Sequence, residues 1–173
     1  MGDRSVTRNC GPDLARVGAG LPVAAYRDEI TTALHGGRAV IVAPPGTGKT
    51  TFVPPLVASR CSGRVIVTQP RRVAARAAAR RLATLTGTRP GEFASHTVHG
   101  ESTTTRDTKV EFVTTGVLLR RLLSDPDLTG VDAVVLDEVH ERHLDADLVV
   151  AMVCEVAQLR DDLTIVAMSA TVD

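Results

Sequence analysis

Aromatic side chains are scarce in this chain of 173 residues, which has three Phe, one Tyr and no Trp. Proteins that hold single-stranded bases by stacking need aromatic surfaces, so an aromatic content of 2% disfavours base-stacking recognition. The chain also lacks an apolar run of about eighteen residues, the length that predicts a membrane-spanning helix. Its polar start lacks the apolar core of a secretory signal peptide. These absences predict a protein without a membrane partner.

Cysteine and lysine are rare as well. Cys10, Cys61 and Cys154 are odd in number and far apart, so they predict neither a disulfide framework nor a paired-cysteine zinc motif. Such cysteine usage is typical of the reducing cytoplasm, where we expect this protein. Lysine occurs twice, at Lys49 and Lys109, against eighteen arginines. A lysine is therefore an unusual cation in this chain.

The remaining composition is ordinary for one globular domain, with 43% hydrophobic and 23% charged residues. A formal net charge of zero conceals an uneven distribution. Residues 1–91 carry 14 basic and 4 acidic side chains, whereas residues 92–173 carry 6 and 16. The basic half could form an anion-binding face, or the two halves could pair with each other in the fold. Charge alone leaves both interpretations open.

Short β-branched runs alternate with segments of helical period along the chain. The runs are apolar almost throughout, as expected of strands buried on both faces of a parallel sheet. Strands are predicted at 38–43, 64–69, 109–114, 132–137 and 163–168, with a further strand at 94–100. Helices are predicted at 23–35, 49–59, 71–86, 115–123 and 145–160. The alternation predicts an α/β domain of three layers with a mostly parallel central sheet, preceded by a loose leader at residues 1–20.

The segment "APPGTGKTT", residues 43–51, lies between the first of these strands and the helix after it. It matches the phosphate-loop pattern G-x-x-x-x-G-K-[ST], except that Ala43 replaces the first glycine. Glycines let backbone N–H groups surround a phosphate, and the helix N-terminus adds its dipole. Lys49 is predicted to contact the β- and γ-phosphates, and the Thr50 hydroxyl is a predicted Mg²⁺ ligand. The predicted nucleotide contacts in this loop are Pro45, Gly46, Thr47, Gly48, Lys49, Thr50 and Thr51.

The segment "VVLDEVHE", residues 134–141, supplies the acidic groups that a phosphate loop requires. Asp137 ends a predicted buried strand and is predicted to hold Mg²⁺ through water. Glu138 is predicted to orient and deprotonate the attacking water. Taken singly, the two segments could be a Gly/Pro turn and a helix-capping Asp-Glu pair. Together they predict a P-loop domain that binds a nucleoside triphosphate and Mg²⁺, with Lys49, Asp137 and Glu138 as its candidate catalytic residues.

Five segments, in order, resemble the motifs of the DEAH-box helicases of superfamily 2. They are the phosphate loop, "TQPRRVAA" (68–75), "TTGVLLR" (114–120), "DEVH" (137–140) with Val139 in place of Ala, and "SAT" (169–171). The sequence from "LPVAA" at residue 21 onward most resembles that of the bacterial HrpB-type ATP-dependent helicases. This resemblance implies a RecA-like P-loop NTPase fold over residues 21–173, corresponding to the first RecA-like domain of a helicase.

The resemblance also implies contacts with single-stranded nucleic acid, with RNA favoured over DNA. Arg71 and Arg72 are implied to lie beside the path of the strand, where backbone phosphates are their partners. Thr114, Thr115 and Gly116 are implied to donate hydrogen bonds to the next phosphates. Such contacts ignore base identity, in keeping with the few aromatic residues.

Recognition of the nucleotide base is expected to be loose. DEAD-box relatives carry a glutamine upstream of the phosphate loop that reads adenine, whereas this chain has no glutamine before Gln69. DEAH-type enzymes stack the base on an arginine, and alignment with the helix after "TQPRR" assigns this role to Arg81. The resemblance therefore implies that NTPs other than ATP are also accepted.

The resemblance implies a second RecA-like domain as a partner, because the chain ends soon after "SAT". His140, Arg142, Ser169 and Thr171 are implied to couple the state of ATP to movement of that partner. Without the partner's arginines, the chain alone is expected to be nearly inactive. Two alternatives remain. One is a different P-loop enzyme such as a kinase, and the other is a module that binds nucleotide or nucleic acid without turnover.

Overall fold

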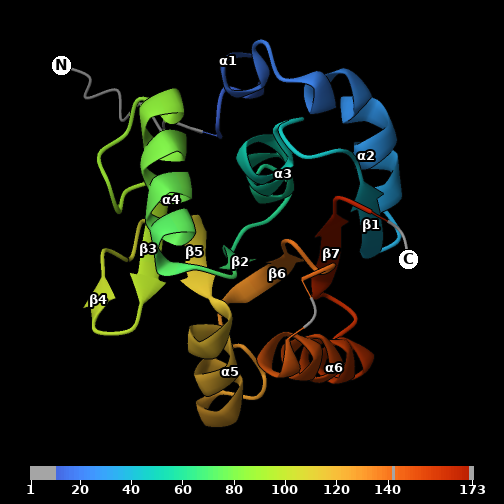
Figure 1. The fold of residues 1–173 in the computed structure, drawn as a ribbon, viewed down its shortest axis with the longest axis vertical. Coiled ribbons are helices and arrows are strands. Elements are labelled where there is room, and N and C mark those ends of the chain that lie inside the picture. The colour runs from blue at the N-terminus through green and yellow to red at the C-terminus, as the bar shows by residue number, and fades with distance from the viewer. Residues whose placement is uncertain (1–10, 142, 172–173) are drawn as a thin grey trace, which may run out of the picture.

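A seven-stranded sheet runs through the residues that the computed structural model describes, 11–141 and 143–171 (Figure 1). In spatial order its strands are β1 (Arg38–Val42), β7 (Thr164–Ser169), β6 (Val131–Leu136), β2 (Arg64–Gln69), β5 (Val110–Thr114), β3 (Ala94–Val98) and β4 (Glu101–Ser102). Neighbouring strands are parallel except for the short β4, which is antiparallel to β3. The six predicted strands are confirmed, and β4 is an addition.

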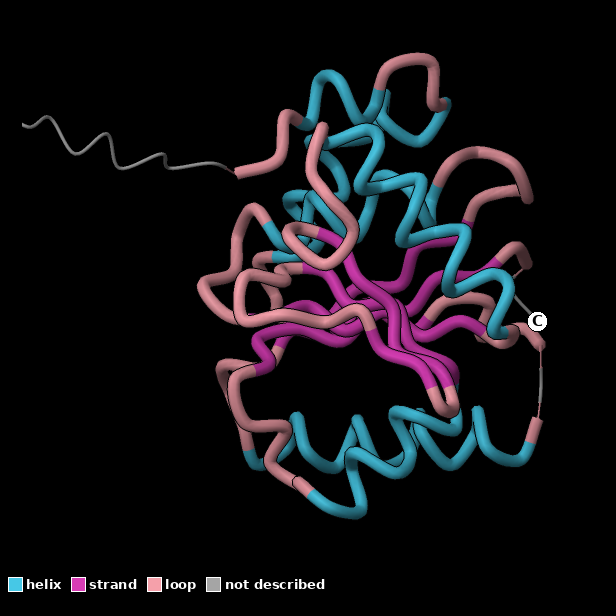
Figure 2. Tube along the Cα trace, turned by 90° about the vertical axis from the view of Figure 1, so that its left-hand side faces the viewer, coloured by secondary structure: helices cyan, strands magenta, loops and turns pink. Residues whose placement is uncertain are grey.

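Helices cover both faces of this sheet (Figure 2). One face carries α1 (Leu14–Gly18), the 3₁₀ helix η1 (Pro22–Tyr26), α2 (Arg27–Leu34), α3 (Lys49–Ala58) and α4 (Arg72–Thr86). The other face carries α5 (Thr115–Ser124) and α6 (Leu144–Leu159). The prediction of a three-layer α/β domain with a mostly parallel sheet is confirmed. Within the described residues, no helix has both the length and the apolar character needed to cross a membrane.

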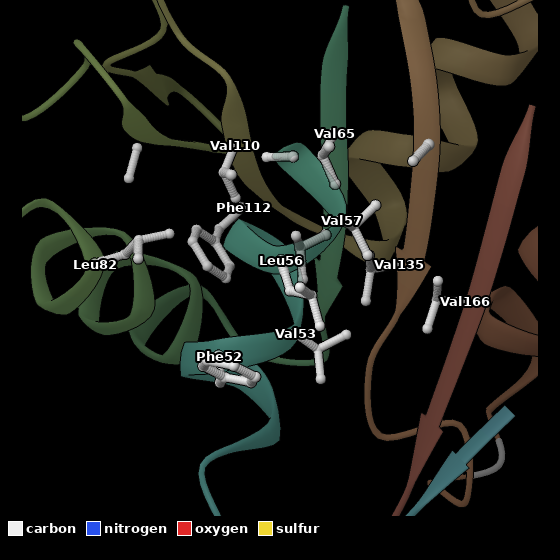
Figure 3. Close-up of a cluster of buried hydrophobic side chains, with 14 of the residues drawn as sticks. Phe52, Val53, Leu56, Val57, Val65, Leu82, Val110, Phe112, Val135 and Val166 are labelled. Carbon is white, nitrogen blue, oxygen red and sulfur yellow. The ribbon is translucent and has the colours of Figure 1, made fainter. Parts of the chain in front are cut away.

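Double burial of the central strands explains their continuous apolar sequences. Along β2, Val65 and Val67 pack into the core beneath α3 and α4, whereas Ile66 packs into the core beneath α5 and α6. Figure 3 shows Val53, Leu56 and Val57 of α3 among side chains of the sheet, which include Val65 of β2 and Phe112 of β5. Because both faces are covered, a polar side chain fits at the strand ends more readily than in their middles.

The expectation of a loose leader through residue 20 is wrong for residues 14–18. They form α1, whose N-cap Asp13 accepts hydrogen bonds through Oδ1 from the backbone N–H groups of Ala15 and Arg16, both at 3.1 Å. Leu14 and Val17 are buried in the core. A helix of five residues is too short for hydrophobic periodicity to reveal it, and its capping aspartate was the available signal.

The ends of the parallel strands bring the predicted functional segments to one edge of the sheet. The phosphate loop follows β1, Arg71 follows β2, and Asp137 follows β6. Thr114 and Ser169 are the last residues of β5 and β7. Strands that run in the same direction all end at the same edge, so five segments far apart in sequence become neighbours there.

Glu111 of β5 places a charge between the layers, and its side chain is fully buried. Arg121 of α5 donates to both carboxylate oxygens, at 2.9 and 2.8 Å, and Arg64 approaches at 3.3 Å. Burial raises the pKa of Glu111, but hydrogen bonds from Arg121 and Thr97 outweigh it and hold that pKa below its ordinary value. The buried carboxylate is therefore charged and depends on Arg121.

We predict that Arg121→Met lowers the free energy of unfolding by about 3–5 kcal/mol, because it removes the main partner of a buried charge. Urea unfolding at pH 7 measures this loss. Arg120→Met, on the exposed side of the same helix, is the matched control and should cost about 0–1 kcal/mol. Equal losses in the two variants would contradict the prediction.

The stability contributed by Glu111 depends on pH. Because the pKa of Glu111 is lowered in the folded protein, this stability is present above the unfolded pKa and is lost as the pH falls through the folded pKa.

Candidate functional site

The phosphate loop between β1 and α3 depends on two glycines in left-handed conformations. Gly46 has φ of 79° and Gly48 has φ of 91°. A Cβ atom on Gly48 would lie 2.9 Å from a methyl carbon of Leu21, so this position also lacks space for a side chain. The carbonyl oxygen of Thr47 accepts a hydrogen bond from the backbone N–H of Val23 at 3.1 Å. The loop is thus fixed against η1.

Lys49 is the first residue of α3, and its side chain returns to the loop that precedes it. Its ammonium group donates to the carbonyl oxygens of Ala43 and Pro44, the latter at 3.2 Å. The residue is 6% exposed. The loop therefore brings a cation and the positive end of the α3 dipole to one place, as an anionic phosphate requires.

Asp137, directly after β6, is 7% exposed and accepts hydrogen bonds from three parts of the chain. Its Oδ2 accepts from the Thr50 hydroxyl and from the Gln69 amide, each at 2.6 Å, and its Oδ1 accepts from the backbone N–H of Glu138 at 3.0 Å. Burial raises the pKa of Asp137, while these hydrogen bonds and the charge of Lys49 oppose the rise.

The donor set around Asp137 fits Mg²⁺. Thr50 and Asp137 offer a hydroxyl and a carboxylate oxygen side by side, and Mg²⁺ prefers oxygen ligands. Among the described residues, no group of three or more His, Cys, Asp or Glu side chains forms a metal cage. Mg²⁺ in phosphate sites needs no such cage, because it takes one or two protein ligands and completes its shell with phosphate oxygens and water.

Glu138 has a left-handed backbone with φ of 56°, which is uncommon outside glycine and concentrates at functional sites. Its side chain is 35% exposed. Burial and the neighbouring charge of Asp137 raise the pKa of Glu138, while His140 and Lys49 act against the rise. A carboxyl group with a raised pKa that water still reaches is suited to accept a proton.

His140 connects Glu138 to the segment after β7. Its Nε2 lies 3.1 Å from Oε2 of Glu138, and its Nδ1 lies 3.3 Å from the backbone N–H of Ala170. Because Nδ1 accepts from that N–H, a neutral ring has its proton on Nε2, the atom that faces the Glu138 carboxylate. The imidazole thus bridges "DEVH" and "SAT".

Ser169 lies beside the phosphate loop and is hydrogen-bonded to Thr171. The carbonyl oxygen of Ser169 accepts from the backbone N–H of Ala43 at 3.2 Å. The Ser169 hydroxyl donates to the carbonyl oxygen of Thr171 and accepts from its N–H at 3.2 Å. Arg142, the remaining predicted coupling residue, lies outside the described residues.

The predicted nucleic-acid contacts lie next to these acidic groups. Thr114, Thr115 and Gly116, where α5 begins, line a cleft of about 310 Å³ together with Asp137 and Glu138. Arg71 and Arg72 are exposed at the start of α4. The structure thus brings together the phosphate loop, the acidic pair and the start of α5. The two arginines follow β2, the strand that lies between β6 and β5.

The uneven charge distribution is neutralised in part. Arg76 of α4 pairs with Glu101, its Nε lying 3.0 Å from Oε2, and Arg64 pairs with buried Glu111. The other arginines on and beside α4, all within the described residues, are exposed and have no ion pair and no side-chain hydrogen bond: Arg71, Arg72, Arg80 and Arg81. Both sequence interpretations therefore hold in part, since some cations pair within the fold and others remain available for an anion. Contact between Arg81 and a nucleotide base stays a prediction.

Sequence reasoning missed three groups that surround Asp137 and His140. Gln69 donates to the Asp137 carboxylate, the Thr68 hydroxyl accepts from the Asp137 backbone N–H at 3.1 Å, and the Ala170 N–H donates to His140. The sequence could have indicated a role for Gln69, because it is a polar residue that ends an apolar strand. No sequence pattern indicates a contact made by the backbone N–H of Ala170.

Comparison with known proteins gives consistent results. A sequence model described as DEAD/DEAH box helicase matches residues 26–173. The chain is 44% identical over 157 residues to ATP-dependent RNA helicase HrpB of Escherichia coli (strain K12), covering 88% of this chain and 19% of that protein. It is 35% identical to ATP-dependent RNA helicase HrpA of Borreliella burgdorferi, again over 88% of this chain and 19% of that protein.

The fold matches solved structures as well. It is similar to the crystal structure of the Escherichia coli DEAH/RHA helicase HrpB with a TM-score of 0.84 and 43% identity. That match covers 89% of this chain and 20% of the other chain. The chain spans about a fifth of the length of these bacterial relatives.

We predict that Gly48→Ala weakens nucleotide binding and destabilises the fold by more than Gly46→Ala. Both variants force a side chain into a left-handed conformation, at a cost of about 1–2 kcal/mol, and Gly48→Ala adds the clash with Leu21. Urea unfolding and titration with a fluorescent ATP analogue measure the two effects. Gly36→Ala is the control, because its φ is ordinary and its Cβ would have space. A Gly48→Ala protein as stable as this control would refute the prediction.

Proposed function

The chain belongs to the DEAD/DEAH box helicase family, and we propose that it is the ATP-binding RecA-like domain of an ATP-dependent RNA helicase. In this proposal it couples NTP hydrolysis to movement along single-stranded nucleic acid. The observation that carries it is the 2.6 Å hydrogen bond between Thr50 and Asp137, which joins the phosphate loop to the acidic segment. A Gly/Pro turn or a helix cap alone would not require this contact. The RNA substrate is supported by the names of the bacterial relatives.

The residues of the site have distinct roles in the proposed hydrolysis. Backbone N–H groups of the loop at Gly46 and Gly48 surround the phosphates, and Lys49 neutralises the charge of the β- and γ-phosphates. Thr50 and Asp137 would hold Mg²⁺, which supplies additional positive charge at the phosphates. Glu138 orients a water and accepts its proton.

The connections among these segments support the proposed coupling to movement. His140 binds both Glu138 and Ala170, so a displacement of the segment after β7 reaches the proposed base directly. We propose that a second RecA-like domain is the partner that causes such displacements through Ser169, Thr171 and Arg142. The partner would also supply arginines to the transition state, and such arginines are worth about 10³–10⁵ in rate in comparable phosphoryl transfers.

The nucleic-acid strand is proposed to run over the edge where β2 and β5 end. Arg71 and Arg72 would bind its backbone phosphates, and Thr114, Thr115 and Gly116 would donate to the next ones. The cleft beside Gly116 continues to Asp137, so strand and nucleotide would occupy adjoining parts of one edge. We also propose a cytoplasmic location, on the basis of the sparse, unpaired cysteines.

We predict that Lys49→Ala and Glu138→Gln separate binding from turnover. Lys49→Ala should weaken Mg·ATP binding about 10- to 100-fold, because a charge-assisted contact is lost. Glu138→Gln should bind Mg·ATP normally, because Lys49, Thr50 and Asp137 remain, but it should abolish turnover in a protein that carries both RecA-like domains. Titration with a fluorescent ATP analogue and a phosphate-release assay measure the two properties.

Three outcomes of that experiment would contradict the proposed function. Unchanged Mg·ATP binding by Lys49→Ala would show that the phosphate loop does not bind the nucleotide. Normal turnover by Glu138→Gln would show that Glu138 is not the catalytic base. Nucleotide binding by the two-domain wild type without turnover would favour the alternative of a binding module.

We predict that the double variant Arg71→Ala/Arg72→Ala binds single-stranded RNA more weakly, by the same factor for unrelated sequences. Because two phosphate contacts are lost, the log–log salt dependence should flatten by at most about two units. Fluorescence anisotropy over a series of salt concentrations measures this. The matched control is Arg60→Ala/Arg106→Ala, which removes the same charge from exposed positions in the loops before β2 and β5. Weakening confined to one RNA sequence would instead indicate base recognition.

A further inference from the structure

Gln69 is a buried polar side chain at the centre of the site, and the proposed chemistry leaves it without a role. It is the last residue of β2 and is 5% exposed. On one side, β5 pairs with β2 so that Thr114 is opposite Gln69. On the other side, β6 pairs with β2 up to Leu136 opposite Thr68, and Asp137 is the next residue. Gln69 therefore lies between Thr114, a proposed contact of the nucleic acid, and Asp137, the proposed Mg²⁺ ligand.

The amide of Gln69 has one orientation that suits this place. Its nitrogen lies 2.6 Å from Oδ2 of Asp137. An amide oxygen at that distance from a carboxylate would repel it, whereas an amide N–H donates to it. The contact is therefore a charge-assisted hydrogen bond, which is stronger than a neutral one.

The other donors to Asp137 show why this one matters. Thr50 donates to the same oxygen, but its hydroxyl is also a proposed ligand of Mg²⁺ and would turn toward the ion. The N–H of Glu138 holds Oδ1, the other oxygen. Gln69 is thus the side-chain donor that can keep Oδ2 in place while Thr50 binds the metal.

We propose that Gln69 is a positioning residue of the metal site, which holds the Asp137 carboxylate in the orientation that receives Mg²⁺. This inference rests on the proposed function, because Asp137 must be the metal acid. Gln69 itself contacts neither the ion nor the nucleotide. Its loss therefore changes the dependence of nucleotide binding on Mg²⁺ rather than the contacts of the phosphate loop.

The test compares Gln69→Met with Gln158→Met. Methionine matches glutamine in length and removes the donor, and Gln158, on the exposed side of α6, is the other glutamine of the chain. Binding of a fluorescent ADP analogue is titrated in EDTA and at increasing Mg²⁺ concentrations. For Gln69→Met we expect unchanged affinity in EDTA and a half-saturating Mg²⁺ concentration raised about tenfold or more. Gln158→Met should match the wild type in both.

The outcomes separate this inference from the proposed function. A wild-type chain whose ADP binding ignores Mg²⁺ would overturn both. A wild-type chain that responds to Mg²⁺, together with a Gln69→Met chain that responds identically, would overturn the role of Gln69 alone. Equal loss of affinity with and without Mg²⁺ would show a general structural role and would also overturn it.

A second variant covers the case in which Gln69→Met lowers the melting temperature too far for binding to be measured. Gln69→Asn keeps a polar amide at the buried position but withdraws its nitrogen by one methylene, which breaks the contact with Asp137. A folded Gln69→Asn chain, verified by its melting temperature, should show the same selective rise in the Mg²⁺ requirement. A normal requirement in that chain would overturn the proposal.

Discussion

The buried carboxylate of Asp137 is the interaction on which the site depends. Removing a carboxylate from water is costly unless donors replace the lost hydration, and here burial raises its pKa while the donors act in the opposite direction. Those donors come from α3, from the end of β2 and from the next residue of the chain. The start of α3 and the ends of β2 and β6 must all be in place for these hydrogen bonds to form. The site is therefore held together by the same elements that build the sheet and its covering layer.

Much of this could be predicted from sequence, for physical reasons. Strands buried on both faces have continuous apolar sequences, and the intervening helices are long enough to show their period, so the elements and the layers were predictable. Phosphate loops and acidic strand ends have residue patterns that chemistry dictates, and these identified Lys49, Thr50, Asp137 and Glu138. The five-residue α1 was missed because so short a helix buries two large side chains without a visible period.

The spatial order of the strands could not be predicted in the same way. Chain order places β2 next to β1, whereas the sheet inserts β7 and β6 between them. This arrangement sets Gln69 beside Asp137 and Ala170 beside His140, and neither contact has a sequence pattern of its own. The partners of the site thus follow from strand order, which depends on long-range packing.

The position of β7 between β1 and β6 explains how distant events could reach the nucleotide. Its end contacts the phosphate loop through Ser169 and Ala43, and it contacts the acidic segment through Met168 and Val139, whose backbone groups are 3.1 Å apart. His140 adds a third contact, to Ala170. A force on the segment after β7 would therefore act on the proposed phosphate-binding loop and on Glu138, the proposed base. On the opposite side of β6, Gln69 joins Asp137 to the strand that leads into Arg71 and Arg72. Asp137 and Glu138 thus lie between two strands, one leading to the proposed nucleic-acid contacts and the other to the proposed partner domain.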